Sequence, residues 1–236
     1  DRRFLGKAVT IAFPVAMQGM LNTIVNLVDT MMIGTLGETS IAAVGLANKV
    51  FFVFSLLVFG IVSGSGVLAA PYWGNHDVKN IRKVLGLALM ISIAGSLCFL
   101  IPAQLCPEAV MRIFTTSQSS ITVGAAYLAV VSLSYPCTAI SNTYVAMLRA
   151  VGKVKAPVVI SCITIGINIL FNYIFIFGHF GAPAMGAPGA ALATLIARIA
   201  ECGALLAVTF ISRSPLACRI KELWGYSRAF LRQFAV

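Results

Sequence analysis

The chain has 236 residues, of which 59% are hydrophobic and only 10% are charged, and it carries a net charge of +10 at pH 7. A soluble domain contains about 25% charged residues, so this composition excludes an ordinary soluble globular protein. Apolar runs recur from one end of the sequence to the other. They indicate an all-α, multi-pass membrane protein, because a helix satisfies its own backbone hydrogen bonds in lipid.

Hydropathy predicts six membrane spans, each with roughly the 20 apolar residues that a helix needs to cross a bilayer. Glycine and proline residues punctuate the stretches between these spans. In chain order, the predicted spans are Ala8–Gly34, Ile41–Ala70, Val84–Ala103, Ile121–Leu148, Pro157–Phe177 and Gly189–Ile211.

The basic residues are concentrated in alternate connections between the spans. Cytoplasmic loops carry an excess of lysine and arginine, so this pattern predicts a plasma-membrane protein with both ends of the chain in the cytoplasm. The positive charge follows the topology and does not favour a nucleic-acid partner. The basic side carries Arg2, Arg3, Lys7, Lys79, Arg82, Lys83, Arg149, Lys153, Lys155, Arg213, Arg219, Lys221, Arg228 and Arg232, and the other side carries Arg112 with Glu38, Glu108 and His179.

Span one carries four polar residues on a single helical face. In chain order they are Gln18, Asn22, Asn26 and Asp29, at steps of four, four and three. A carboxylate at the centre of a membrane helix costs about 2.5–3.5 kcal/mol on insertion scales, so Asp29 is expected to face a cavity or a partner and to have a function. The alternative for the stripe is hydrogen bonding between helices with no further role.

Four spans place an oxygen-bearing side chain at a similar depth in the outer half of the membrane. From the 1.5 Å rise per residue, each lies roughly 8–9 Å from the outer end of its span. If these helices meet, their carboxylate, amide, hydroxyl and phenol oxygens form a cage that suits a hard cation or a proton. The residues are Asp29 in span one, Tyr127 in span four, Asn172 in span five, with Asn168 four residues before it on the same face, and Thr194 in span six.

Three other charged residues fall inside spans. Arg198 and Glu201 are three residues apart in span six and are expected to form a mutually neutralising pair that fixes this helix. A role for the pair in proton movement is the alternative. Lys49 in span two either lines the cavity or extends toward the membrane surface. Span two also contains a GxxxG pattern, Gly60 and Gly64, which predicts close helix packing or a hinge.

The sequence contains no motif typical of an enzyme. It has no P-loop, no HExxH and no nucleophile elbow. His76 and His179 are predicted on opposite sides of the membrane, and the six cysteines lack metal-ligand spacing, which favours small buried hydrophobes. The chain is therefore predicted to have no enzymatic activity and no cofactor other than a coupling ion. A membrane enzyme or a non-transporting scaffold stays as the alternative class.

The end of the chain is similar to its beginning. Phe230–Gln233 and Phe4–Lys7 each come within two residues after an arginine and precede apolar residues, which indicates the start of a second bundle. The expected organisation is a six-helix transmembrane lobe over residues 1–212, followed by a cytoplasmic connector and the start of a second repeat over 213–236. Within the connector, Ile220–Arg232 is basic and aromatic and predicts a helix on the membrane surface.

Several segments, in this order and spacing, resemble the N-terminal lobe of a MATE (multidrug and toxic compound extrusion) transporter. They cover most of the chain and are specific in combination. The segments are NLVDTMMIGTLGETSIAAVGLAN, SGSGVLAAPYWGNHDVKNIRKVLGLAL, YVAMLRAVGKVKAP, NILFNYIFIFG and GAPGAALATLIARIAE.

The resemblance implies one lobe of a twelve-helix exporter that exchanges cationic or amphipathic organic compounds for Na⁺ or H⁺. The missing C-terminal lobe and the bilayer are then its partners. The family's aspartate of span one matches Asp29, which would be the carboxylate ligand if the ion is Na⁺. Its tyrosine and threonine correspond to Tyr127 and Thr194. Its Asn-x-x-x-Asp pattern of span five matches Asn168 but meets Asn172 where the acid is expected.

That departure leaves the coupling ion open. A single carboxylate out of water suits a proton, whereas the carbonyl oxygen of Asn172 still suits Na⁺. Lys49 is a second departure, because a cation near the cavity opposes cationic substrates. A lipid-linked oligosaccharide flippase of the same superfamily is the alternative function, and it predicts a basic cavity in which Lys49 and Arg198 are the candidates for binding pyrophosphate.

Overall fold

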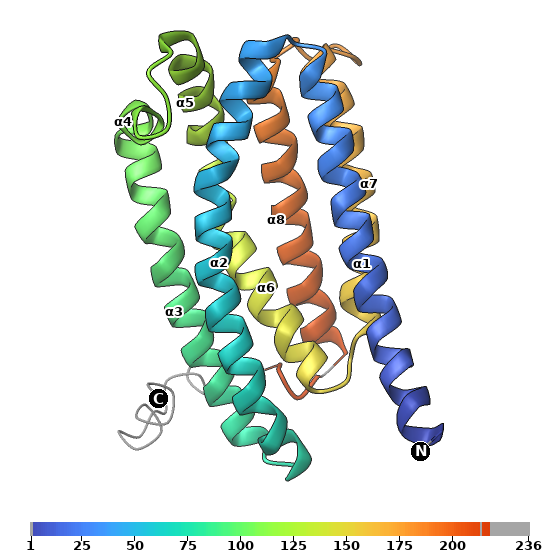
Figure 1. The fold of residues 1–236 in the computed structure, drawn as a ribbon. Coiled ribbons are helices and arrows are strands. Elements are labelled where there is room, and N and C mark those ends of the chain that lie inside the picture. Colours follow the sequence, from blue (N-terminus) through green and yellow to red (C-terminus); the bar gives the residue numbers. More distant parts are fainter. Residues whose placement is uncertain (1, 213, 218–236) are drawn as a thin grey trace.

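The computed structural model describes the backbone of residues 2–212 and 214–217, and the side chains from Ala16 onward except that of Asn22. Every regular element in this part of the chain is a helix (Figure 1). The helices are α1 (Arg2–Gly34), α2 (Glu38–Gly74), α3 (Val78–Leu105), α4 (Pro107–Arg112), α5 (Gln118–Ser132), α6 (Tyr135–Ala150), α7 (Lys155–Phe177) and α8 (Ala187–Ile211).

The predicted all-α membrane fold is confirmed. Within the described residues, α2, α3, α7 and α8 are long and apolar enough to cross a membrane, and the bent pair α5–α6 passes as one broken span. With the 33 residues of α1, the chain forms a six-helix lobe to which α4 is added as a short helix at one end.

The predicted span Ile121–Leu148 is not one straight helix. It is interrupted after Ser132 and bends by 49° between α5 and α6. Pro136 in the first turn of α6 has no N–H to donate to the carbonyl four residues earlier, which favours the break. The Gln104 side chain of α3 donates to the Ala129 carbonyl (2.5 Å) and the Ser132 hydroxyl (2.8 Å), so an amide from another helix satisfies polar groups near the break.

The helices form a bundle with two apolar clusters along its length. Near the α4 end, Phe54 of α2 stacks on Tyr135 of α6 with ring centroids 4.8 Å apart, and both side chains are fully buried. Toward the other end, Leu85 of α3 and Met147 of α6 lie in a second buried cluster. α1 packs mainly on α7, and α7 packs on α8, so these three helices form one side of the lobe (Figure 1).

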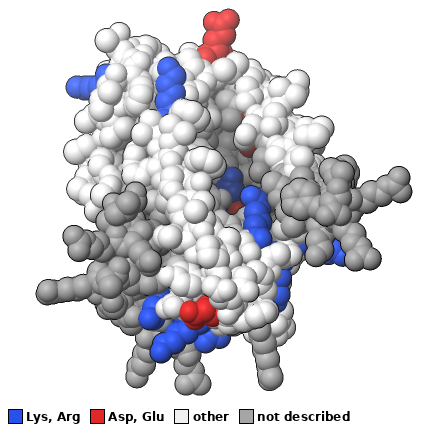
Figure 2. All heavy atoms as spheres, turned by 60° about the horizontal axis from the view of Figure 1, so that its bottom comes forward, with Lys and Arg blue, Asp and Glu red and all other residues white. Residues whose placement is uncertain are grey.

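The two ends of the bundle differ in charge. One end, at the bottom of Figure 1, contains the α2–α3 and α6–α7 connections, and we call it the basic end. Figure 2 turns this end forward and shows Lys and Arg side chains gathered around it. Its described basic residues include Lys79, Lys83, Arg149, Lys153 and Lys155, whereas the opposite end has Glu38, Glu108 and Arg112. The structure thus gathers most of the described loop lysines and arginines at one end, as the loop pattern predicted.

Small residues allow close helix approach at particular positions. A Cβ added at Gly189 of α8 would lie 2.5 Å from the Phe175 carbonyl oxygen of α7, in the most extensive helix contact of the lobe. In contrast, no described atom lies within 4 Å of a Cβ added at Gly60 or Gly64. The described residues therefore do not pack closely on the GxxxG pattern, and the alternative of a hinge stays a prediction.

We expect Gly189→Ala to destabilise the lobe by about 1–3 kcal/mol, the usual cost of overpacking a filled site. The added methyl group would meet backbone atoms of α7, which cannot move aside as a flexible side chain can. The control is Gly203→Ala in the same helix, where the added methyl meets no described atom within 4 Å and helix propensity favours alanine. Thermal unfolding in detergent measures both variants, and equal melting temperatures would contradict the contact.

Candidate functional site

A cavity of about 680 Å³ opens between α1, α2, α5, α6, α7 and α8. Asp29 of α1, Tyr127 of α5, Asn168 of α7 and Thr194 of α8 line one part of it, and Arg198 and Glu201 of α8 line another. Figure 2 shows a hollow in this face of the lobe, with basic and acidic side chains inside it. The cavity thus joins two groups of polar side chains, which we call the Asp29 site and the Gln18 network.

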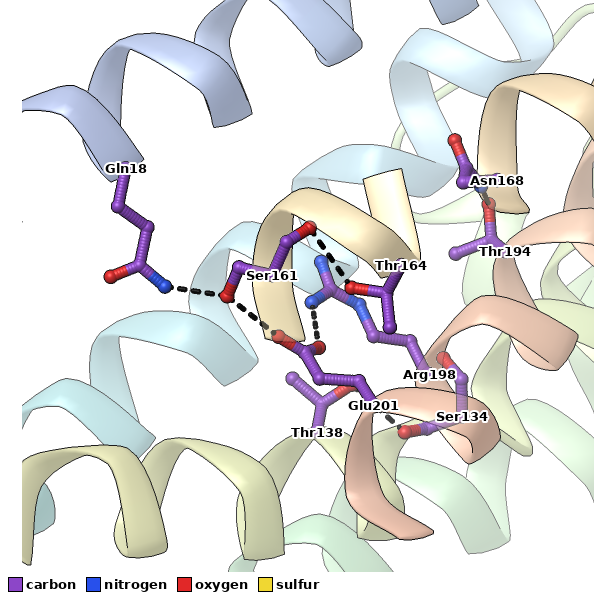
Figure 3. A network of polar contacts seen from close by, with 9 residues as sticks. All are labelled: Gln18, Ser134, Thr138, Ser161, Thr164, Asn168, Thr194, Arg198 and Glu201. Carbon is purple, nitrogen blue, oxygen red and sulfur yellow. Dashed lines mark hydrogen bonds and ion pairs between the residues drawn. The ribbon is translucent and has the colours of Figure 1, made fainter. Parts of the chain in front are cut away.

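The Asp29 site brings together residues that the sequence placed at similar depths or on the same helix face. Asn172 Nδ2 donates to Asp29 Oδ1 at 2.5 Å and to Asn168 Oδ1 at 3.2 Å. Asn168 Nδ2 in turn lies 3.5 Å from the Thr194 hydroxyl. A hydrogen-bonded chain therefore runs from α1 through α7 to α8, and Figure 3 shows its Asn168–Thr194 part.

Asn172 is the most enclosed member of the site. Its side chain is 0% exposed, and its Oδ1 has no hydrogen-bond partner among the described residues. A buried polar atom without a partner costs about 1–3 kcal/mol, so this carbonyl oxygen is available to a ligand or to a proton donor. The position where the MATE pattern expects an acid therefore offers a neutral oxygen beside a single carboxylate.

Tyr127 lies in the wall of the cavity beside the site, but it is not part of the hydrogen-bonded chain. Its side chain is buried and lines the same cavity as Asp29. The described hydrogen bonds do not join its hydroxyl to the Asp29, Asn168 or Thr194 side chains. Tyr127 is thus placed beside the site as predicted, with its contact to an ion left to the proposal below.

The polar stripe of α1 divides between two surroundings. Asn26 and Asp29 line the cavity, whereas Gln18 is buried and contacts α6 and α7. The side chain of Asn22 lies outside the described residues. Asn26 and Asp29 thus face the cavity, and Gln18 has the role in hydrogen bonding between helices that was the alternative for the whole set.

The Gln18 network contains the predicted ion pair and extends it (Figure 3). Arg198 Nη1 lies 2.8 Å from Glu201 Oε2, which confirms the pair. Ser161 of α7 donates from its hydroxyl to Glu201 Oε1 at 3.3 Å and accepts from Gln18 Nε2 at 2.6 Å. Arg149 of α6 donates to Gln18 Oε1. The network therefore links α1, α6, α7 and α8.

Ser161 and Arg149 were not singled out from the sequence as site residues. Ser161, Thr164, Asn168 and Asn172 follow at steps of three, four and four, so a polar stripe on α7 is readable in the sequence. The charge pattern of the sequence places Arg149 among the loop charges. Its last-turn position in α6 instead allows the long side chain to extend back to Gln18.

Lys49 is exposed on α2 and is absent from the described lining of the cavity. Its neighbour Asn48 does line the cavity. Lys49 thus lies outside the described cavity lining, which leaves the alternative in which it extends toward the membrane surface.

The fold and the charged cavity define a multi-pass helical membrane protein with a polar centre inside an apolar bundle. The chain belongs to the MatE family, whose model matches residues 14–174. It is 28% identical over 228 residues to a probable multidrug resistance protein NorM of Thermotoga maritima, covering 95% of this chain and 49% of that protein. It is 27% identical over 198 residues to the multidrug resistance protein PmpM of Pseudomonas aeruginosa, covering 82% of this chain and 40% of that one.

Solved structures agree with this assignment at the level of the fold. An outward-facing multidrug resistance MATE family transporter of the MOP superfamily superposes with a TM-score of 0.85 at 23% identity, covering 97% of this chain and 50% of that chain. A MATE structure in the straight conformation gives a TM-score of 0.84 with the same identity and coverage. The chain thus spans about half the length of the relatives it matches, as expected for one lobe.

Proposed function

We propose that this chain is the N-terminal lobe of a cation-coupled antiporter that exports drugs or other organic compounds across the cell membrane. One observation carries the proposal: Asp29, a carboxylate within an apolar bundle, lines a cavity and is hydrogen-bonded across helices to Asn172. Charged groups inside membranes mark ion and substrate pathways. The names of the relatives, multidrug resistance proteins, agree with export.

In this proposal Asp29 binds the coupling ion, and Tyr127, Asn168, Asn172 and Thr194 complete or orient the site. When Asp29 is ionised, Asn172 donates its amide N–H to the carboxylate, which is the arrangement in the structure. When Asp29 holds a proton, it becomes a donor, and an amide flip of Asn172 would present the unpartnered Oδ1 as the acceptor. If the ion is Na⁺, the same oxygens supply hard ligands.

Coupling then requires that the ion has different affinities for two conformations of the protein. α1 is the natural mobile element, because it carries Asp29 and packs mainly on α7 alone. An ion that replaces the Asp29–Asn172 hydrogen bond changes how α1 is held and thereby the shape of the cavity. Substrate affinity changes with it, which is the basis of exchange.

The charge of the cavity favours a cationic or neutral cargo. Among the described lining residues, two carboxylates, Asp29 and Glu201, face one guanidinium, Arg198, which is already paired with Glu201. A flippase that holds pyrophosphate needs a surplus of basic groups, and Lys49 does not add one to this lining. The antiporter is therefore the better-supported function, with the basic end of the lobe placed in the cytoplasm.

The test is efflux of ethidium, an organic cation, by the full-length transporter in proteoliposomes. An imposed inward H⁺ or Na⁺ gradient should accelerate dye release several-fold, and the gradient that works identifies the ion. Dye movement that is indifferent to both gradients would overturn the proposal of a cation-coupled antiporter.

A further inference from the structure

Within its described side chains, α1 is hydrogen-bonded to other helices at two places. One is Asp29, which accepts from Asn172, and the other is Gln18, which bonds to Ser161 and Arg149. The hydroxyls of Thr23 and Thr30 in α1, and of Thr35 in the turn after it, donate only to backbone carbonyls of α1. Asp29 and Gln18 are separated by roughly 16 Å along the helix axis. The two halves of α1 are therefore held by chemically separate contacts.

The contact at Gln18 is built differently from the one at Asp29. Gln18 is 7% exposed, and both ends of its amide have partners: Nε2 donates to Ser161, and Oε1 accepts from Arg149. Glu201 is 8% exposed, and each of its oxygens also has a partner. A buried network in which every polar group has a hydrogen-bond partner makes a structure rigid, because opening it leaves several buried polar groups without partners at once. At the Asp29 site, by contrast, Asn172 Oδ1 has no partner.

We propose that Gln18, Ser161 and Glu201 form an anchor that fixes the basic-end half of α1 against α6, α7 and α8, so that ion binding displaces only the half that carries Asp29. The displacement of that half rests on the proposed function, whereas the anchor rests on the Gln18 network alone. Glu201 acts through Ser161, and Arg198 and Arg149 hold the outer members of the chain in place. In this role they are positioning residues, because each acts on α1 through the others.

The experiment measures spin-label distances by pulsed electron paramagnetic resonance in the full-length, cysteine-free transporter. One pair, Met17→Cys with Ile91→Cys, reports the basic-end half of α1 against α3, and a second pair, Met31→Cys with Ile101→Cys, reports the other half. All four residues are at least 40% exposed in this lobe. In the parent protein, a change of pH or Na⁺ should shift the second pair by several Å and leave the first unchanged.

Ser161→Ala removes the hydroxyl that joins Gln18 to Glu201 and should broaden or shift the first pair by several Å. Ser161→Thr, which keeps a hydroxyl, should restore the narrow distribution. The matched control is Ser92→Ala, which removes a buried hydroxyl in contact with Thr143 between α3 and α6, without touching α1. Gln18→Leu should reproduce Ser161→Ala, which guards against an effect confined to one variant.

The anchor is overturned if the first pair keeps its parent distribution in both Ser161→Ala and Gln18→Leu, or if Ser92→Ala shifts it equally. It is also overturned if ions shift the first pair as much as the second in the parent protein. An ion-insensitive second pair, together with a first pair that still responds to Ser161→Ala, would instead count against the proposed function and leave the anchor standing.

Discussion

Replacement of Asp29 with asparagine is expected to abolish ion-driven efflux by the full-length transporter, with a loss of at least about tenfold. Coupling energies between two bound ligands are typically about 1–3 kcal/mol, or roughly 5–150-fold, and this variant removes the group through which the coupling would act. The amide keeps the size of the side chain and the contact with Asn172, so the lobe should still fold. Dye efflux from proteoliposomes under an H⁺ gradient and under a Na⁺ gradient measures the loss.

The control for this variant is Glu38→Gln, the same chemical change at an exposed carboxylate in the first turn of α2. Glu38 lies outside the described cavity lining, and its variant should export at the parental rate. If Asp29→Asn also exports at the parental rate under the same gradient, Asp29 is not the coupling residue.

Replacement of Asn172 with aspartate is expected to strengthen cation binding by about tenfold or more. The present amide nitrogen lies 2.5 Å from Asp29 Oδ1, so the variant places two carboxyl groups in one buried site. Like charges at that distance cannot both stay ionised without a counter-ion, and either a shared proton or a bound Na⁺ relieves the repulsion. A tenfold change corresponds to about 1.4 kcal/mol, which is modest for a buried charge pair.

The measurement is the ion concentration that gives half-maximal efflux, compared among the parent, Asn172→Asp and Asn172→Leu. The leucine variant removes both the donor to Asp29 and the unpartnered oxygen, and it should weaken ion dependence. If the parent and Asn172→Asp share one half-maximal concentration for both ions, Asn172 does not take part in ion binding.

The Asp29 site was predictable because two simple rules define it. Helical periodicity places polar residues on one face, and the 1.5 Å rise sets their depth once the ends of a span are known. Asp29, Asn172, Asn168 and Thr194 met these rules and are joined by hydrogen bonds in the structure. The predicted pairing of Arg198 with Glu201 followed equally from spacing within one helix.

The Gln18 network was not predictable, because periodicity identifies a face but not the helix opposite it. Ser161 was an ordinary hydroxyl in the sequence, and it became significant only when α7 placed it between Gln18 and Glu201. Arg149 also fits the pattern of loop charges, so nothing in the sequence indicates that its side chain donates to Gln18. The break between α5 and α6 was missed because apolar residues continue across it, although Pro136 marked the position.

The connector 213–236 and the second repeat stay predictions. Most of that range, including Ile220–Arg232, lies outside the described residues, and the division at residue 212 follows from hydropathy and charge alone. The half-length match to the relatives agrees with a lobe of a longer protein.

An ion at Asp29 and a substrate in the cavity are expected to influence one another's binding. Ion release on substrate addition to the purified full-length transporter tests it most directly, with a pH indicator for H⁺ and an ion-selective electrode for Na⁺. We predict that ethidium releases one of the two ions from the parent protein and from Glu38→Gln, and releases neither from Asp29→Asn. Equal ion release by the parent and Asp29→Asn, or ethidium binding to the parent with no release of either ion, would contradict ion coupling at Asp29.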